Sequence, residues 1–171
     1  MAPWQFMLKI IPVAGLLRIH GEIPKKIEAV RFSIYSSVED LDLLLDTIPD
    51  YWCGQLTKTQ VESKLSSLLP STVSWSESAR MFGESKKDSF EIWGNTQKTD
   101  RVTLSFSLSE PNIDFMKKAI AIVRESDCVF LDAQSNDVFN ASVEEFIVRA
   151  EMNSASRFLP DHFSLSEMLK E

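Results

Sequence analysis

The sequence predicts an α+β fold, built as a single antiparallel or mixed sheet with helices packed mainly on one face. The clearest sign is a pair of segments, residues 90–93 and 102–108, in which apolar and polar side chains alternate. This period of two is typical of antiparallel strands that are buried on one face only. A helix is predicted directly afterwards, to about Glu125, because one apolar stripe runs through Ile113, Met116, Ile120 and Val123.

Length and composition indicate one globular domain, residues 1–171. Hydrophobic residues make up 44% of the chain and charged residues 25%, which are ordinary globular values. The longest apolar run, residues 10–17, is far shorter than the roughly 18 residues that a membrane-spanning helix needs. We therefore expect no membrane segment, no signal peptide and a cytoplasmic location. Two cysteines fit reduced thiols, with one disulfide in an exported protein as the alternative.

The first half of the chain is predicted to contain strands at residues 6–13 and 30–35 and a helix from Ser37 to about residue 47. A second helix begins at Thr57, which forms a capping box with Gln60. Its apolar stripe consists of Val61, Leu65, Leu68 and Leu69. A short strand at residues 72–75 and a polar, mobile connection at residues 76–87 are expected to follow.

The C-terminal part of the chain contains further strand and helix signals of the same kinds. Pro111 is expected in the first turn of the helix at residues 113–125. A strand at residues 127–132 is expected to pair with Val138 and Phe139. Two further helices are predicted from capping pairs three residues apart, which are Ser142 with Glu145 and Ser164 with Glu167.

The formal net charge of −7 is concentrated in two blocks. Residues 32–57 contain no Lys or Arg, and residues 125–171 contain three basic and ten acidic side chains. Such blocks oppose direct nucleic-acid binding, because phosphates require Lys and Arg. They suit a basic protein partner, although acidic residues that only keep the protein soluble are the alternative.

No catalytic, cofactor-binding or metal-binding set is recognisable. His20 and His162 lie in no known motif, and no cysteine or histidine spacing fits zinc. The glycines are isolated, so no phosphate-binding loop is formed. The remaining catalytic alternatives are Cys53 acting with a histidine, or a pair of carboxylates, and surface acids or a packed thiol explain these residues more simply.

One loop combines acidic and aromatic residues, as protein interfaces often do. It follows the predicted acidic helix, and the predicted interface comprises Glu39, Asp42, Asp46, Asp50, Tyr51 and Trp52. The alternative is that both aromatic rings fold into the core. A homodimer is also left open by the sequence.

From residue 90 onward the order of elements resembles a known family. Two strands, the helix to Glu125 and the strand at residues 128–132 are followed, after the last helix, by Ser154-Ala155-Ser156-Arg157-Phe158-Leu159-Pro160-Asp161. This resembles small bacterial immunity proteins of polymorphic toxin systems, such as Rhs-type and type VI secretion effectors. The resemblance covers the C-terminal half and implies a non-catalytic, stoichiometric inhibitor whose partner is a cognate toxin. The alternatives are an adaptor or chaperone of a secretion system and an unrecognised enzyme.

If the acidic block binds a basic toxin cleft, charge reversal at Asp42 and Asp46 should weaken toxin binding, because both carboxylates would then repel their partner. Calorimetric titration of the toxin domain with the double variant measures this. Unchanged affinity would contradict the placement of the interface but not the function.

Overall fold

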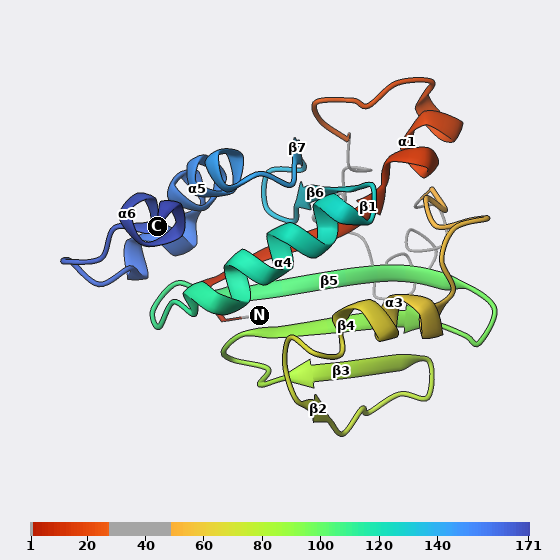
Figure 1. Cartoon of the computed structure of the whole chain (residues 1–171), viewed down its shortest axis with the longest axis horizontal. Coiled ribbons are helices and arrows are strands. Elements are labelled where there is room, and N and C mark those ends of the chain that lie inside the picture. The colour runs from red at the N-terminus through yellow and green to blue at the C-terminus, as the bar shows by residue number, and fades with distance from the viewer. Residues whose placement is uncertain (1, 28–48) are drawn as a thin grey trace, which may run out of the picture.

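The computed structural model describes residues 2–27 and 49–171. Within these ranges the chain forms a seven-stranded sheet in the order β2-β3-β4-β5-β1-β6-β7, and every neighbouring pair is antiparallel (Figure 1). The strands are β1 (Gln5–Pro12), β2 (Ser71–Thr72), β3 (Ala79–Gly83), β4 (Ser89–Gly94), β5 (Thr99–Ser107), β6 (Cys128–Asp132) and β7 (Val138–Asn140). The helices are α1 (Val13–His20), α3 (Lys58–Leu65), α4 (Ile113–Glu125), α5 (Val143–Met152), the 3-10 helix η1 (Ser154–Phe158) and α6 (Leu165–Lys170). The predicted α+β class and antiparallel sheet are confirmed.

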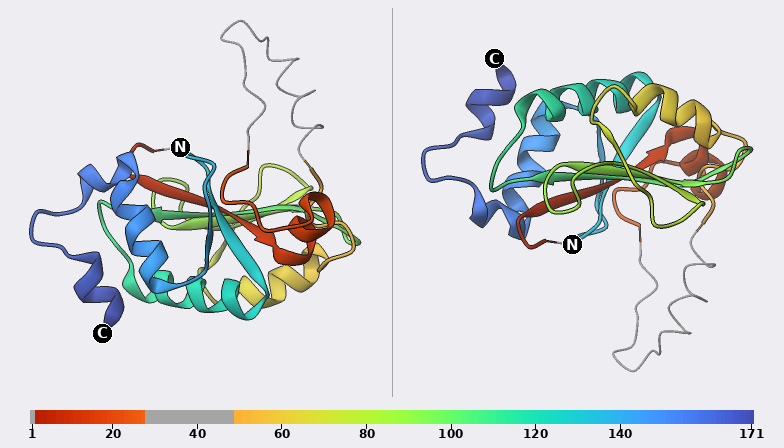
Figure 2. Two further views of the ribbon diagram at one scale, coloured as in Figure 1. Left: turned by 90° about the horizontal axis from the view of Figure 1, so that it is seen from above. Right: turned by 90° about the horizontal axis from the view of Figure 1, so that it is seen from below.

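One face of the sheet carries most of the helices. Phe6 and Leu8 of β1 point to this face, as do Leu104 and Phe106 opposite them on β5. The helices α3, α4, α5 and α6 bury their apolar stripes against these side chains, and we call this layer the main core. Figure 2 shows α3 and α4 end to end along this side of the sheet. The prediction that helices lie mainly on one face is confirmed.

Aromatic rings fill the centre of the main core. The ring of Phe146 on α5 meets Phe6 and Phe106 edge-on, with centroids 5.5 and 5.1 Å apart. All three side chains are fully buried. Edge-to-face contacts add to the free energy of burial, so α5 is fixed against the two central strands.

The opposite face is covered at one end only. Ile11, Val129 and Val138 form a second core with Leu16 of α1. Each helix in the described residues buries its apolar positions in one of the two cores. The part of this face formed by β4 and β5 therefore has no helix from residues 2–27 or 49–171 packed on it.

Several sequence predictions differ from the structure in instructive ways. The apolar run at residues 10–17 is split, because Pro12 ends β1 and the chain turns into α1. The polar connection at residues 76–87 contains β3, whose Ala79 and Phe82 are buried. Pro111 precedes the helix rather than entering it, since Asn112 is the N-cap. The strand at 30–35 and the helix at 37–47 lie outside the described residues.

The capping predictions are largely confirmed. Thr57 and Gln60 form a complete capping box at the start of α3. Ser142 accepts a hydrogen bond from the Glu145 amide, but the Glu145 carboxylate binds the Asn140 amides instead of completing the box. At the sheet edge, the two-residue β2 pairs with only Met81 and Phe82 of β3.

The turn between β3 and β4 is fixed by a partly buried carboxyl group, that of Asp88. Asp88 Oδ1 accepts a hydrogen bond from the Ser107 amide at 2.8 Å. Burial raises the pKa of Asp88 to about 6, although hydrogen bonds from Ser107 and Asn112 oppose this and the charge of Glu110 adds to it. The folded chain thus binds this proton more tightly than the unfolded chain does.

The free energy of unfolding should therefore fall as the pH rises between 3.8, the ordinary pKa of this group, and about 6. Asp88→Asn should remove this slope and, with its amide oxygen still accepting from Ser107, stabilise the protein at neutral pH by about 1 kcal/mol after allowance for solvent screening. Urea denaturation across this pH range measures both effects, with exposed Asp161→Asn as the control. An unchanged slope in Asp88→Asn would contradict this assignment.

Candidate binding surface

The predicted interface residues are only partly within the described chain. Glu39, Asp42 and Asp46 lie outside the described residues. Asp50 is half-buried, and its Oδ2 forms an ion pair with Lys98 Nζ at 2.6 Å. Arg18 of α1 donates a hydrogen bond to the Asp50 carbonyl oxygen. Asp50 therefore ties its loop to α1 and to the β4–β5 turn.

Tyr51 and Trp52 are core residues, with only 6% and 5% of their surfaces exposed. Tyr51 packs in the second core, and Trp52 packs in the main core. The expectation that these rings are exposed interface anchors is therefore not met, and the alternative that they fold into the core holds. The physical reason is that the two cores end at this loop, where each ring completes one of them.

Close packing of α1 on the loop explains the position of Tyr51. A Cβ atom at Gly15 would lie 1.9 Å from the Tyr51 carbonyl oxygen, so only glycine allows this approach. The Tyr51 hydroxyl and His20 Nε2 are hydrogen-bonded at 2.9 Å. Burial raises the pKa of Tyr51, which keeps the phenol neutral. His20, at the end of the helix that covers the second core, thus has a structural partner in the loop that carries Tyr51.

The cysteines occupy different environments. Cys53 is exposed, and Figure 1 places its loop at the opposite end of the molecule from the turn before α6, which carries His162. Cys128 is buried, and burial with the nearby charge of Asp127 raises its pKa to about 12 although Lys64 opposes this. A thiol with so high a pKa is a poor nucleophile at neutral pH. Because the loop of Cys53 and the turn of His162 lie at opposite ends of the molecule, the structure does not bring this pair together.

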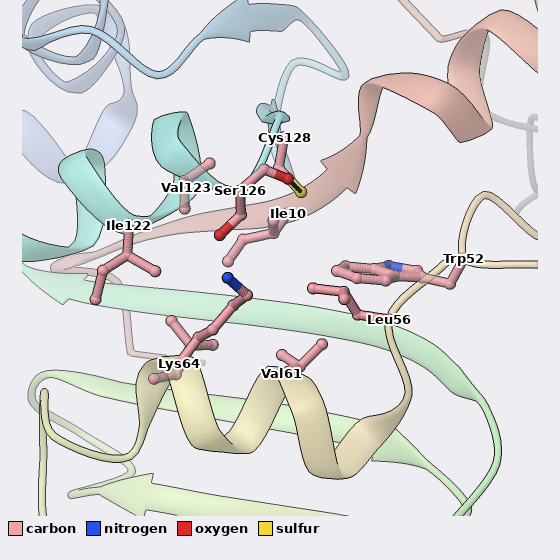
Figure 3. A pocket seen from close by; sticks show the side chains of 10 residues that line it. Ile10, Trp52, Leu56, Val61, Lys64, Ile122, Val123, Ser126 and Cys128 are labelled. Carbon is pink, nitrogen blue, oxygen red and sulfur yellow. Dashed lines mark hydrogen bonds between the residues drawn. The ribbon is translucent and has the colours of Figure 1, made fainter. Parts of the chain in front are cut away.

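A small cavity lies beneath α3 and the end of α4 (Figure 3). Its volume is about 20 Å³, enough for about one water molecule. The lining is mostly apolar and includes Ile10, Trp52 and Val61, while Lys64 and Ser126 supply polar atoms. An open depression of about 510 Å³ lies beside it, lined by residues that include Gln55, Glu125 and Asp127. Cys128, whose raised pKa makes its thiol a poor nucleophile, also lines the small cavity.

Two further features bear on binding. Within residues 2–27 and 49–171, no group of three or more His, Cys, Asp and Glu side chains could hold a metal ion. None of the helices in these ranges is long and apolar enough to cross a membrane. Charged and aromatic side chains also gather on the part of the sheet that no described helix covers.

Strand register places charged and aromatic side chains together on this uncovered part. Trp93 of β4 pairs with Arg101 of β5, and Thr103 pairs with Lys9 of β1. Glu91 also pairs with Thr103, so its side chain lies on the same face. Residues directly opposite on neighbouring strands share a face. We name this surface the open face and define it by Lys9, Glu91, Trp93, Arg101 and Thr103, together with the neighbouring Trp75.

Aromatic contacts organise one side of the open face. The indole of Trp75 is 74% exposed and meets Trp93 edge-on, with ring centroids 5.2 Å apart. The Arg101 guanidinium lies over Trp93, 4.6 Å from the ring centroid. Trp93 Nε1 donates a hydrogen bond to Glu91 Oε2 at 2.9 Å. This network fixes three side chains while it leaves the Trp75 ring in solvent.

Two positive charges lie near one another on the open face. Burial lowers the pKa of Lys9, and the positive charge of Arg101 lowers it further. Among the described residues, neither Lys9 nor Arg101 forms an ion pair with a carboxylate. The open face thus carries two cations and one carboxylate, that of Glu91, on a chain whose net charge is −7.

Sequence analysis did not identify this surface. The alternation in β4 and β5 correctly predicted one buried and one wetter face, but it did not mark the wetter face as a site. Lys9 and Trp75 are far from β4 in sequence, and the strand order that joins them was not predicted. The signal in the sequence that could have indicated this surface is the presence of Trp93 and Arg101 on the two strands of the predicted hairpin.

Comparisons with protein-family models, curated proteins and solved structures gave no match for this chain.

Trp52, which is buried, and Trp75, which is exposed, provide a direct test of this geometry. Trp52→Ala should destabilise the protein by about 3 kcal/mol or more, because it leaves a cavity in the main core. Trp75→Ala should change the free energy of unfolding by less than about 1 kcal/mol, because that ring is mostly in solvent. Urea denaturation measures both. Equal losses would contradict the assignment of Trp52 to the core and Trp75 to the surface.

Proposed function

We propose that this protein is an immunity protein, which binds a cognate bacterial toxin domain stoichiometrically and neutralises it. The observation that carries the proposal is the open face, where the exposed Trp75 contacts Trp93 and the Arg101 guanidinium lies over Trp93. Lys9 and Arg101 have no carboxylate partner among the described residues. Tryptophan and arginine are the residues most often responsible for affinity at protein interfaces. The resemblance of the C-terminal half to immunity proteins supplies the kind of partner.

Neutralisation by binding requires a rigid surface rather than a catalytic group. The residues of the open face other than Trp75 lie on three paired strands, β1, β4 and β5, so these side chains hold their positions before a partner arrives. Preorganised side chains lose little conformational entropy on binding. A protein that covers about 800 Å² of a toxin in this way can block access of substrate to the toxin's active site.

The acidic block supports a second contact region in the same proposal. Glu39, Asp42 and Asp46 stay a prediction from the sequence, whereas Asp50 is engaged by Lys98. A toxin with a basic cleft would be attracted by such carboxylates. The cytoplasm is the proposed location, because a toxin delivered to a cell must be neutralised there.

The test is co-expression with the toxin encoded by the neighbouring gene. Cells that produce the toxin alone should die, and cells that also produce this protein should grow. The two chains should also purify as an equimolar complex. Trp75→Ala serves as a folded control whose rescue reports on the open face.

Two outcomes would contradict the proposal. A stable complex without rescue would identify an adaptor or secretion chaperone, which binds an effector without inactivating it. Rescue without a complex would indicate that the protein acts on the toxin's substrate or product. A neighbouring reading frame with Rhs repeats or a secretion marker identifies the toxin to be used.

A further inference from the structure

We infer that the open face binds an acidic segment of the partner protein, with Asp or Glu carboxylates over Lys9 and Arg101 and an apolar side chain against Trp75. The identity of that partner as a toxin rests on the proposed function. The chemistry of the surface does not, since it follows from the positions and charges of these side chains alone.

Geometry places the two cations where one acidic segment can reach both. Arg101 and Thr103 are two residues apart on β5, so their side chains lie on the same face. Lys9 is directly opposite Thr103 on the adjacent strand. The cations are therefore diagonal neighbours across one strand pair, within reach of a single extended segment.

Electrostatics favours an anion between these groups. The charge of Arg101 makes Lys9 harder to protonate, which shows that the two groups repel each other. A carboxylate placed over both would reverse this effect, because it attracts each cation. Glu91 does not take this role within the described residues, since its carboxylate accepts the hydrogen bond from Trp93.

Some of the other cations of the chain are already paired. Carboxylate partners within the described residues are present for Arg80, Lys87, Lys98, Lys118 and Arg149. Lys25, Lys58 and Lys117, among others, likewise have no carboxylate partner within the described residues. Lys9 and Arg101 are set apart by their position, since they are diagonal neighbours across one strand pair and their charges interact. The adjacent Trp75 ring offers apolar area for a side chain next to the carboxylates in the bound segment.

The surface fits an acidic protein segment better than a nucleic acid. Nucleic acids are held by rows of Lys and Arg that replace the counterions of successive phosphates. The open face has two cations, and Glu91 lies on the same face. A second copy of this chain fits less well, because a symmetric pairing of two open faces would bring like charges together.

The experiment is a titration of the complete, isotope-labelled protein with short peptides. The probe contains Asp and Glu on both sides of a leucine, and its matched control replaces every acid by Asn or Gln. The indole N–H resonances of Trp75 and Trp93 report binding by nuclear magnetic resonance. We expect the acidic peptide to shift both resonances and the amide peptide to leave them unchanged.

The variant Lys9→Met/Arg101→Gln should weaken acidic-peptide binding by about fivefold or more, because two charge contacts are lost. Lys118→Gln, on α4 and away from the open face, is the matched control and should bind as the native protein does. Added salt should weaken binding to the native protein, which tests the charge argument even if the double variant fails to fold.

Three results would overturn the inference. These are equal binding of the acidic and amide peptides, tighter binding of a single-stranded oligodeoxythymidine than of the acidic peptide, and a sedimentation-measured dimer that Trp75→Ala dissociates. Failure of the titration with intact toxin rescue would remove the inference and leave the proposed function standing. Peptide binding without toxin rescue would contradict the proposed function and leave the inference about the open face standing.

Discussion

The antiparallel pairing of β1 with β5 decides which side chains reach each layer of this protein. Leu8 lies opposite Leu104 in the main core, and the next pair, Lys9 and Thr103, faces the other way. A slip of one residue would exchange these faces and place Lys9 in the apolar layer. The core and the open face therefore depend on the same register.

The loop at residues 49–55 shows why composition alone misassigned a site. Its acidic and aromatic residues are typical of an interface, yet Tyr51 and Trp52 enter opposite cores across the end of the sheet. The burial of Tyr51 depends on the helix α1, whose Gly15 admits the loop backbone. The sequence did not reveal that helix, because the apolar run around Pro12 continued the pattern of β1.

Local patterns predicted much of the fold, whereas contacts between distant segments did not follow from them. The β4–β5 hairpin and α4 were predicted because a period of two and an apolar stripe are properties of adjacent residues. The strand β3 was missed because its surroundings are polar. The open face was missed because Lys9, Trp75 and Arg101 meet only through the order of the strands. At physiological ionic strength, interactions between exposed charges are screened beyond about 8 Å. The charges of Lys9 and Arg101 therefore govern the contact of the open face with a partner, even on a chain of net charge −7.

The short β2 has a consequence for the behaviour of the protein at high concentration. Because β2 covers only Met81 and Phe82, the beginning of β3 remains at the margin of the sheet. Uncovered margins invite strand addition from other molecules and hence aggregation. Arg80 lies in this stretch, and its guanidinium is held by Glu62 of α3 at 3.0 Å. A fixed charge at that point hinders the approach of an apolar strand, so Arg80 opposes strand addition at this margin.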